Sequence, residues 1–588
     1  MCGYLISNLK TSEKKFSEAL ATLAHRGPDN TSVSESDGWR YGHVRLSLFD
    51  LSPNSNQPVE LDCSGSRFVF NGEIFNYQEF GSCVSDTLML KERFLELKGD
   101  LNLIDSFKSL LNQLNGFFSI AVKIDHRVYF IRDRFGEKPL YLFVKNNNII
   151  GASEIKAIRA LIDVQISSIE LYRLSNDPFD FAVGSLGADL YKTAYENVYE
   201  LRPGCLAVYD IKENKISTHE WYSLRDDIEK YKSYNPTDLY IDSLRLRLKS
   251  DAKGAFTLSG GVDSSANCLV SKRIIGSEVS AFSVISSHSE YSESASIEKN
   301  KEKLVNKHYS IFEEEILQDL TAEKVFELIR HFDYPYFDPN IVQYSLYNSI
   351  REAGYKFVID GHGADELLSG YQWHQPHLAY HAFRNSNVLM AMQVTSYFFK
   401  SYPKNYSFIY KAAVYSKGIL QAISGSRNMN YFGHNPKKES NIRFQELFSR
   451  VLLRLLNNYD MTSMKSSIEV RTPYMDYRLV ACILSQKNEF FCGEANKPWL
   501  RNLIRHNSDI EIMTKKVGLR SYLWKSMKPQ EVKLIYDKYT EAIKDINSIV
   551  GTTNTTQAIP MCDMNSLSPS KEHDFWKVLS FKVLKDAV

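Results

Sequence analysis

Cysteine is scarce and unpaired in this chain of 588 residues. It has eight Cys, and none of them belongs to a C-x-x-C pair. This pattern argues against both a disulfide framework and a zinc site, and it is typical of a protein in the reducing cytoplasm. Six of the eight are expected to be small buried hydrophobic side chains: Cys63, Cys205, Cys268, Cys482, Cys492 and Cys562.

Long apolar runs and an excess of charge of one sign are also missing. No stretch of 18 apolar residues exists, and the most apolar piece, 388–399, is too short, so we expect no membrane-spanning helix. The N-terminus has no apolar signal core, so export is not expected. The formal net charge of +1 supports neither a nucleic-acid partner nor an anionic-membrane partner. Small-molecule substrates are therefore the expected partners, and a homodimer is compatible with the sequence.

The chain is long enough for more than one hydrophobic core. At 588 residues two or more domains are expected. Hydrophobic residues make up 43% and charged residues 24%, which is ordinary for globular domains and leaves the function to be read from motifs.

The heptad Ser259-Gly-Gly-Val-Asp-Ser-Ser265 is the most informative motif. It follows an apolar run, 254–258, that predicts a buried strand, and it precedes a run, 266–275, that predicts a helix. A Gly-rich turn there aims backbone N–H groups and a helix N-terminus at one anion. The carboxylate of Asp263 beside an anion site is explained by a bound Mg²⁺. The loop does not fit G-x-x-x-x-G-K-[ST], and a plain Gly-Gly turn is the alternative interpretation.

This heptad resembles the pyrophosphatase loop of ATP-dependent adenylating enzymes. In those enzymes the loop holds the pyrophosphate part of ATP while the α-phosphorus is attacked, which yields an acyl-adenylate. The resemblance implies ATP and Mg²⁺ as cofactors and Asp263 as a metal ligand. It also implies the following ATP-binding residues: Leu258, Ser259, Gly260, Gly261, Asp263, Ser264, Ser265, Val284 and Gly361.

Cys2 is a candidate nucleophile. Met followed by a small residue is normally trimmed, which would leave Cys2 with a thiol and a free α-amine. The amine titrates near pH ~8, so it can act as the general base for its own thiol. An N-terminal Cys alone is weak support, because most such residues are incidental.

Five further motifs in the first third strengthen the case for Cys2. Taken together and in this order, they resemble the glutamine amidotransferase domain of the N-terminal-nucleophile type, over roughly residues 2–205. The motifs are His25-Arg-Gly-Pro-Asp29, Arg45-Leu-Ser-Leu-Phe-Asp50, Phe68-Val-Phe-Asn-Gly-Glu-Ile-Phe-Asn76, Arg132-Asp-Arg-Phe-Gly-Glu-Lys-Pro-Leu-Tyr141 and Ala152-Ser-Glu-Ile-Lys-Ala157. Of these, 45–50 is expected to be a strand and 152–157 the start of a helix.

The resemblance implies a role for each residue of a glutaminase site. Cys2 would attack the side-chain amide of glutamine and release ammonia. Asn71 and the backbone N–H of Gly72 would form the oxyanion hole, worth roughly 10²–10³-fold in rate per donor. Arg45 would bind the α-carboxylate as a fork-to-fork pair. Glu73 and Asp86 would hold the α-ammonium, while a surface ion pair is the alternative for Arg45 and Asp86.

The rest of the chain alternates predicted strands and helices, which predicts a parallel sheet with its ligand at the carboxyl ends of the strands. One buried strand, 355–359, runs into Asp360-Gly-His-Gly-Ala-Asp-Glu-Leu-Leu-Ser-Gly-Tyr371. This segment, Ser463–Asp476 and Lys497-Pro-Trp-Leu-Arg501 resemble the signature of asparagine synthetases. The resemblance implies that Asp365 is the second Mg²⁺ ligand and that Lys497 neutralises pyrophosphate. Glu366 would either support the metal ligands or act as a charge at a helix N-terminus.

The implied fold is an α+β N-terminal-nucleophile sandwich domain followed by an α/β parallel-sheet ATP-pyrophosphatase domain with added helices. We place the glutaminase domain at residues 2–210, a connecting segment at 211–237 and the synthetase domain at 238–588. Ammonia must pass between the two sites unprotonated, so we expect an internal passage lined largely by apolar side chains.

Two residues depart from the pattern of the family. His362 stands where the family has the Glu that assists ammonia attack, and Tyr334 stands where a Glu is common. A neutral imidazole can accept a proton from ammonia, so His362 remains a catalytic candidate. Aspartate is the first candidate for the acceptor. A sugar uronate or peptide carboxylate, with the aromatic stretch 372–460 shaping its pocket, and a silent regulatory homologue are the alternatives.

Overall fold

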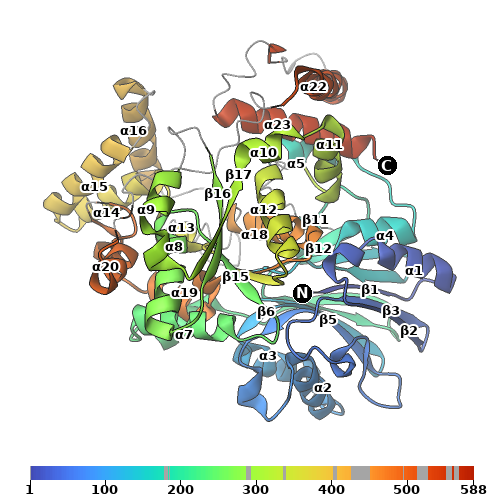
Figure 1. Cartoon of the computed structure of the whole chain (residues 1–588). Coiled ribbons are helices and arrows are strands. Elements are labelled where there is room, and N and C mark those ends of the chain that lie inside the picture. Colours follow the sequence, from blue (N-terminus) through green and yellow to red (C-terminus); the bar gives the residue numbers. More distant parts are fainter. Residues whose placement is uncertain are drawn as a thin grey trace.

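Two antiparallel sheets form the N-terminal part of the chain, and one parallel sheet forms the centre of the remainder (Figure 1). This computed structural model describes residues 2–177, 183–184, 186–286, 293–335, 340–401, 407–424, 451–493, 495–510, 512, 527–550, 559–561 and 569–587. Cys562 and, within the aromatic stretch 372–460, residues 402–406 and 425–450 lie outside these residues.

The two antiparallel sheets have eight and six strands. In spatial order the first contains β10 (Val183–Gly184), β11 (Gly187–Lys192), β12 (Val198–Leu201), β8 (Tyr141–Lys145), β9 (Asn148–Ala152), β1 (Cys2–Ser7), β3 (Trp39–Arg45) and β2 (Asn30–Ser36). The second contains β14 (Lys215–Glu220), β13 (Cys205–Asp210), β7 (Arg127–Arg132), β6 (Gly116–Ile124), β5 (Arg67–Ile74) and β4 (Val59–Glu60).

The two sheets pack face to face, and helices cover their outer faces, which gives four layers (Figure 1). Tyr4 and Trp39 from one sheet meet Phe130 and Ala207 from the other in the buried core between them. The covering helices are α1 (Glu13–Ala21) and α4 (Ile155–Leu161) on the eight-stranded sheet, and α2 (Asp86–Leu97) and α3 (Leu103–Gln113) on the six-stranded sheet. This arrangement matches the predicted N-terminal-nucleophile sandwich.

The end of the first domain differs in detail from the expected boundary at residue 210. Strand β14 pairs along its whole length with β13, from Cys205–Glu220 to Asp210–Lys215. It therefore completes the six-stranded sheet although it lies in the expected connecting segment. A short helix, α6 (Leu224–Tyr231), follows it before the second domain begins with α7 (Pro236–Leu248).

The second domain is built on the predicted parallel sheet. In spatial order its strands are β17 (Lys307–Phe312), β16 (Ser280–Ile285), β15 (Gly254–Thr257), β18 (Phe357–Ile359) and β19 (Glu469–Arg471). Alternate residues of β15 face opposite cores, with Phe256 on one side and Ala255 on the other. Helices lie on both faces: α7, α8 (Val262–Leu269), α9 (Ser294–Leu304) and α19 (Tyr477–Leu484) on one, and α12 (Ile341–Glu352) and α18 (Val451–Lys465) on the other (Figure 1).

Two helical groups extend beyond the sheets. The first, at the left of Figure 1, contains α14 (His374–Arg384), α15 (Val388–Ser401) and α16 (Phe408–Ser424) beside α20 (Pro498–Asn507). The second contains α22 (Pro529–Val550) and α23 (Pro569–Lys585), which pack on α11 (Ala322–His331) and α5 (Ser168–Asn176). Among the described helices, none combines the length and the apolarity that crossing a membrane requires.

Most of the cysteines lie as expected. Cys205, Cys268, Cys482 and Cys492 are buried, but Cys63 is exposed, which corrects the expectation of a buried side chain there. Cys63 lies between β4 and β5, outside both strands, so no alternation pattern carries it into the core.

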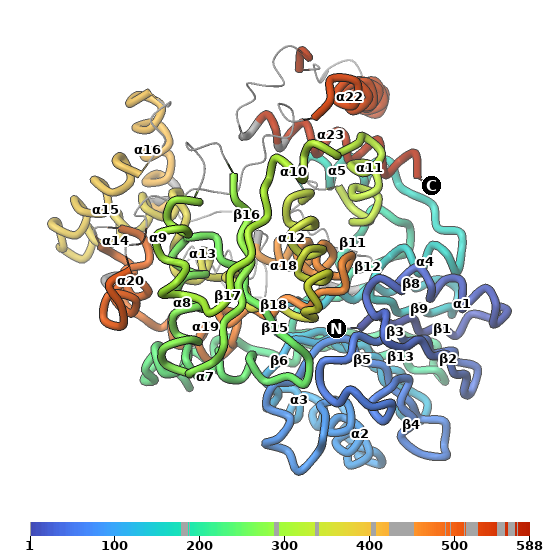
Figure 2. The backbone as a smooth tube through the Cα atoms, viewed as in Figure 1, coloured from blue at the N-terminus to red at the C-terminus, as the bar shows by residue number. Residues whose placement is uncertain are grey.

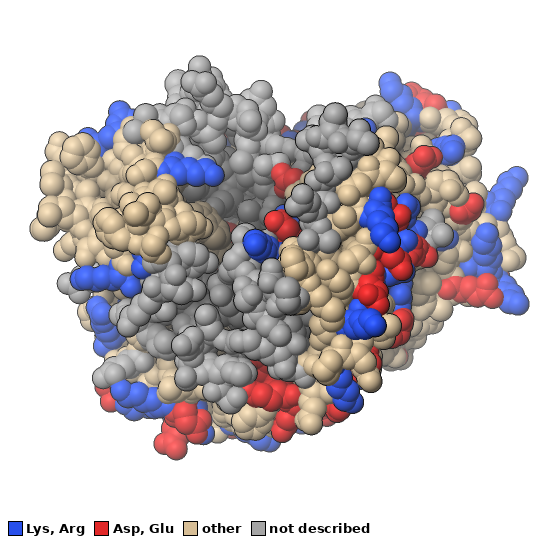
Figure 3. All heavy atoms as spheres, turned by 90° about the horizontal axis from the view of Figure 1, so that it is seen from above, with Lys and Arg blue, Asp and Glu red and all other residues tan. Residues whose placement is uncertain are grey.

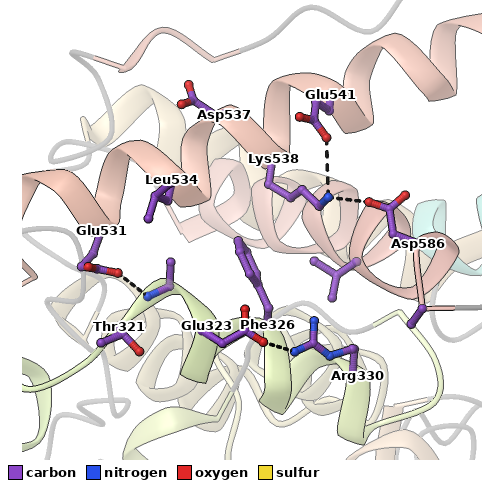
Figure 4. Close-up of a pocket in the computed structure, with 13 residues that line it drawn as sticks. Thr321, Glu323, Phe326, Arg330, Glu531, Leu534, Asp537, Lys538, Glu541 and Asp586 are labelled. Carbon is purple, nitrogen blue, oxygen red and sulfur yellow. Dashed lines mark hydrogen bonds and ion pairs between the residues drawn. The ribbon is translucent and has the colours of Figure 1, made fainter.

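A surface pocket lies between α11 and the two C-terminal helices (Figure 4). Its polar groups largely neutralise one another: Lys538 pairs with Asp586 at 2.5 Å, and Glu531 accepts from the backbone N–H of Ala322 at 2.8 Å. None of the residues expected at either catalytic site lines it. The pocket is explained by helix packing.

Candidate active sites

Cys2 begins the central strand β1 and opens onto a small pocket. Its backbone nitrogen donates to Oδ1 of Asn71 at 3.1 Å, which joins β1 of one sheet to β5 of the other. The pocket is lined by Cys2, Arg45, Gly72, Glu73, Asp86 and Thr87 among others. Burial raises the pKa of the Cys2 thiol above its ordinary value, so the thiol needs a base to become a nucleophile.

Asn71 and Gly72 lie on β5 beside Cys2. Nδ2 of Asn71 is a buried donor with no hydrogen-bond partner among the described residues. A buried N–H of this kind is costly unless a ligand satisfies it, and an oxyanion would do so. Gly72 has φ +145°, and a Cβ there would lie 2.1 Å from the carbonyl oxygen of Phe117. Only glycine fits this position, so the backbone of the expected oxyanion hole is fixed by the strand pairing of β5 with β6.

The expected glutamine-binding residues Arg45 and Asp86 both lie in this pocket. Arg45 ends β3, so 46–50 is a loop and not the strand we expected. One Nη atom of Arg45 donates to the carbonyls of Phe49 and Asp50 in this loop, and the other to the carbonyl of Ser52 at 2.7 Å and the side chain of Asn56 at 2.8 Å. Four N–H groups of the Arg45 guanidinium are thereby used. A substrate carboxylate that bound Arg45 through both oxygens would have to share these groups with the protein. Asp86 accepts from the backbone N–H groups of Ile74 and Thr87.

Glu73 is held differently from the expectation. Its carboxylate forms a bidentate pair with the guanidinium of Arg471, from Nε to Oε1 at 2.8 Å and from Nη2 to Oε2. Both side chains are buried. Arg471 belongs to β19 of the second domain, so Glu73 lines the Cys2 pocket but points its charge at the other half of the chain. Asp86 therefore remains the better candidate for the predicted contact with the α-ammonium of glutamine.

The heptad Ser259–Ser265 follows β15, as predicted, but its last four residues, 262–265, form the first turn of α8, which begins earlier than the expected helix 266–275. Its backbone is held from within: the N–H of Ser259 donates to Oγ of Ser264 at 3.1 Å, and the N–H of Ser265 to the carbonyl of Gly261 at 3.2 Å. Leu258, Gly260 and Val284 complete the expected ATP-binding set around it. Leu258 is buried and donates to β16, Gly260 has φ +81°, and Val284 is half-buried near the carboxyl end of β16.

The second loop reaches the first over the carboxyl ends of β15 and β18. A Cβ on Gly361 would lie 3.0 Å from Cβ of Asp263, so the two loops are in contact. Nζ of Lys497 lies 2.5 Å from Oδ2 of Asp263 and 2.6 Å from Oδ1 of Asp365. Burial opposes the charge of Lys497, but the two carboxylates more than offset it and raise its pKa above the ordinary value. The structure thus brings together Asp263, Asp365 and Lys497.

Two carboxylates around one cation also form a donor set that suits Mg²⁺. A side chain at Gly370 would collide with both partners, because its Cβ would lie 1.9 Å from Oδ1 of Asp365 and 2.4 Å from Cε of Lys497. The close approach of the backbone therefore depends on a glycine. Glu366, next to Asp365, is buried and accepts from the hydroxyl of Tyr371 at 2.6 Å.

His362 lies in the same loop and is paired with a carboxylate. Its Nδ1 lies 2.8 Å from Oδ1 of Asp360, and its backbone N–H donates to the same oxygen at 3.1 Å. The other oxygen of Asp360 accepts from Oγ1 of Thr257 at 2.6 Å. Burial alone would raise the pKa of Asp360, but His362 and the hydrogen bonds lower it. The ring of His362 lies against Tyr459, with centroids 3.4 Å apart.

Comparison with known proteins agrees with this arrangement. A model of the glutamine amidotransferase domain matches residues 1–222, and a model of asparagine synthase matches residues 237–535, just over half of the chain. The chain belongs to the asparagine synthase family. The family therefore confirms the resemblance that the motifs indicate, and this asparagine synthase family member joins a glutaminase half to a synthetase half.

Curated relatives in the asparagine synthase family are distant. Asparagine synthetase [glutamine-hydrolyzing] 1 of Bacillus subtilis is 25% identical over 533 residues, 81% of this chain and 79% of that protein. Amidase chry2 of Gibberella zeae is 28% identical over 403 residues, 62% of this chain and 57% of that protein. The solved glutamine phosphoribosylpyrophosphate amidotransferase of B. subtilis is 13% identical over 53% of this chain and 81% of that one, with a TM-score of 0.28, which is too low to carry an argument.

Tyr334 is the second departure from the asparagine synthase family pattern. It is buried against Phe332 and Met461, and the guanidinium of Arg454 lies 5.0 Å from its ring. Arg454 pairs with Glu200 of the glutaminase half at 3.0 Å. Tyr334 therefore belongs to the contact between the two halves.

Arg26 is a functional candidate that the sequence reasoning missed. Its Nε donates to the carbonyl of Cys2 at 3.0 Å, and its two Nη atoms pair with Glu154 at 2.7 Å and with Asp460 at 2.9 Å. Asp460 lies on α18, which runs close to the N-terminus in Figure 2. Arg26 thus ties the backbone of the nucleophile to the synthetase half. In the sequence, Arg26 stands out only as a cation in the turn motif His25-Arg-Gly-Pro-Asp29.

Buried ion pairs cross the contact between the halves. Nζ of Lys138 lies 2.8 Å from Glu469 and 3.2 Å from Asp460, all of them buried. The ring nitrogens of His25 and His331 and the carboxylate of Glu154 also come within 4.8 Å of one another. Since Glu154 already pairs with Arg26 and Lys156, a metal there would meet two cations, which disfavours a metal site. An apolar ammonia passage stays a prediction.

The pH dependence of glutamine use should show whether Asp86 takes part in binding the substrate. Burial raises the pKa of Asp86 to about 7, and only its charged form attracts an α-ammonium. The base at Cys2 titrates near pH ~8. Below pH 7 both groups are protonated, so log(kcat/KM) for glutamine should fall with a slope of about two in the wild type and about one in Asp86→Asn. Equal slopes in the two proteins would show that Asp86 does not bind glutamine.

Proposed function

We propose that this protein uses ATP to adenylate a carboxylate and then amidates it with ammonia released from glutamine, with aspartate as the first candidate acceptor. The observation that carries the proposal is the convergence of Ser259–Ser265, Asp365 and Lys497 in one half of a chain whose other half presents Cys2 to Asn71.

In the glutaminase half, the sulfur of Cys2 attacks the side-chain carbonyl carbon of glutamine. Its proton passes to the α-amine that removal of Met1 would expose, and then to the departing ammonia. The amide N–H of Asn71 and the backbone N–H of Gly72 face the oxyanion. Water then hydrolyses the thioester to glutamate, which restores the thiol.

In the synthetase half, an acceptor oxygen attacks the α-phosphorus of ATP and pyrophosphate leaves. The backbone N–H groups and hydroxyls of 259–265 hold the phosphates, and Lys497 neutralises the charge of the pyrophosphate. Asp263 and Asp365 would hold Mg²⁺. When bound, this ion supplies positive charge to the phosphate oxygens.

His362 then accepts a proton as ammonia attacks the acyl carbon and AMP leaves. Nδ1 of His362 lies beside the carboxylate of Asp360, so Nε2 is the nitrogen that we assign to accept the proton. The base is lost when the imidazole is protonated. The Asp360–His362 pair would thus do the work of the single Glu of the family.

A non-aspartate carboxylate is the second candidate acceptor, and one observation favours it. Both members of the Asp360–His362 pair replace the Ser and Glu of the family motif, so the loop that faces the acyl group has changed as a unit. The amidase name of one relative points the same way for that protein. Tyr334 gives no support, because it lies in the contact between the halves.

Pyrophosphate release tests both candidates. It would be measured with ATP, Mg²⁺, glutamine and a panel of carboxylates containing aspartate, glutamate, a uronate and a peptide acid. Turnover of aspartate to asparagine would establish the first candidate, and turnover of another acid alone would establish the second. In Asp360→Asn, whose side chain keeps its shape but loses its charge, product formation should fall by about 10²-fold while pyrophosphate exchange persists. No pyrophosphate release with any acid would contradict the proposal.

A further inference from the structure

The region after the Asp365 loop has an unusual composition. From Leu367 to Ser424 the sequence has no Asp or Glu, in a chain that carries 70 of them. The same stretch has five Lys or Arg residues: Arg384, Lys400, Lys404, Lys411 and Lys417. The net charge of the whole chain is nearly balanced, and for that reason we expected no anionic partner. That total conceals the local excess of positive charge in this stretch.

The structure shows that this stretch is a separate helical lobe, which we define as residues 373–401 and 407–424. It contains α14, α15 and α16 and lies at one end of the molecule (Figure 1). The helices pack on one another through an aromatic cluster: the rings of Phe398 and Tyr415 are 5.0 Å apart, and those of Phe399 and Phe408 are 5.3 Å apart. Thr395 and Tyr415 join α15 to α16 through their hydroxyls. The lobe therefore has an interior of its own.

The lobe exposes many large apolar side chains. In the part of the chain that the structure describes, nine of the eighteen exposed large hydrophobic side chains belong to this lobe: Trp373, Phe383, Val388, Leu389, Met392, Phe408, Ile409, Tyr410 and Leu420. Leu389 is 70% exposed and Ile409 is 80% exposed. Soluble surfaces rarely gather so many, and such a concentration marks an interaction surface.

Basic side chains accompany these apolar ones. Arg384, Lys400 and Lys417 are exposed on α14, α15 and α16 in turn. Seen from above, the left-hand lobe shows tan and blue atoms, whereas red atoms gather on the lower and right-hand parts of the view (Figure 3). A helix that exposes Leu, Ile, Met and Phe beside Lys and Arg is the kind of element that lies in an anionic membrane interface.

We propose that the lobe docks on the surface of an anionic lipid bilayer. The exposed apolar side chains would enter the boundary between headgroups and acyl chains, and Arg384, Lys400 and Lys417 would pair with lipid phosphates. A second copy of the chain fits less well, because the described lobe offers no acidic group to a partner lobe and its positive charges would repel. Tyr371 stacks on Trp373 with ring centroids 4.2 Å apart and donates to Glu366, so the docked lobe adjoins the Asp365 loop.

Flotation of the full-length protein with lipid vesicles tests this proposal. The wild type should float with vesicles of phosphatidylcholine and phosphatidylglycerol at low salt. It should stay unbound with phosphatidylcholine alone, and high salt should weaken the binding. Each of Lys400→Gln and Lys417→Gln should lower the vesicle affinity by about five-fold, and the pair by about 25-fold. Leu389→Gln with Ile409→Gln should lower it by at least about tenfold.

Matched controls come from exposed side chains outside the lobe. Leu101→Gln with Ile169→Gln, and Lys14→Gln with Lys232→Gln, should leave vesicle affinity unchanged. Glutaminase activity should be the same in all variants, since none lies in either site. Absence of flotation with anionic vesicles, or equal flotation of lobe and control variants, would overturn the proposal. So would a dimer that the lobe variants dissociate without any vesicle binding, which would assign the surface to a second copy.

Discussion

Replacement of Cys2 by alanine is expected to abolish glutamine-dependent amidation and leave ammonium-dependent amidation intact. The thiol is the only nucleophile proposed for the glutamine carbonyl, so its loss should lower glutamine hydrolysis by about 10⁴-fold or more. The synthetase groups Asp263, Asp365 and Lys497 contact one another and not Cys2, so added ammonium should still reach the adenylate. Glutamate and amidated product, assayed separately with either nitrogen source, give the result.

Two variants sharpen this test. Asn71→Ala removes the buried unpaired donor and should lower glutamine hydrolysis by roughly 10²–10³-fold, less than the loss of the nucleophile. Cys63→Ala removes an exposed thiol and should change neither activity. If Cys2→Ala lost both nitrogen sources together, the two sites would not act separately and the proposed mechanism would be wrong.

The local parts of both sites could be predicted from the sequence. The heptad 259–265 carries its own signals, an apolar run before it and a helical pattern after it, and the structure places it after β15 and across the start of α8. The helical spacing of apolar residues in 239–248 and 321–332 likewise predicts helices, and α7 and α11 lie there. The sequence suggests that one apolar run ends at Asn71-Gly72 and that a second run follows. The strand β5 instead continues through both residues, because Gly72 accommodates the positive φ that this backbone requires.

The contacts between the halves could not be predicted. Glu73 and Arg471 are 398 residues apart, and Arg26 and Asp460 are 434 apart. Neither pair has a local pattern, because an ion pair depends on where two surfaces meet and not on spacing along the chain. The apolar ammonia passage, which stays a prediction, follows from the chemistry of ammonia and says nothing about these buried ion pairs.

Replacement of Arg471 by methionine is expected to weaken both the fold and the coupling of the two reactions. Arg471 is fully buried and also donates to the carbonyls of Arg247 and Lys249. Its loss would leave the charge of Glu73 buried without a partner, which costs about 3–5 kcal/mol. Chemical unfolding should show this loss. Lys303→Met, which breaks an exposed pair with Asp509, should change stability by less than about 1 kcal/mol.

A double variant separates the structural role of this pair from its role in coupling. Glu73→Leu with Arg471→Met replaces the buried pair by apolar side chains, so it should recover most of the lost stability. The coupling should not return. Arg471 lies on β19, where its carbonyl accepts from the N–H of Asp360, and Glu73 follows the oxyanion residues directly, so their ion pair links the glutaminase strand to the loop of His362. The ratio of glutamate formed to product amidated should therefore rise above one in the double variant. A ratio that stays at one would mean that the pair only holds the halves together.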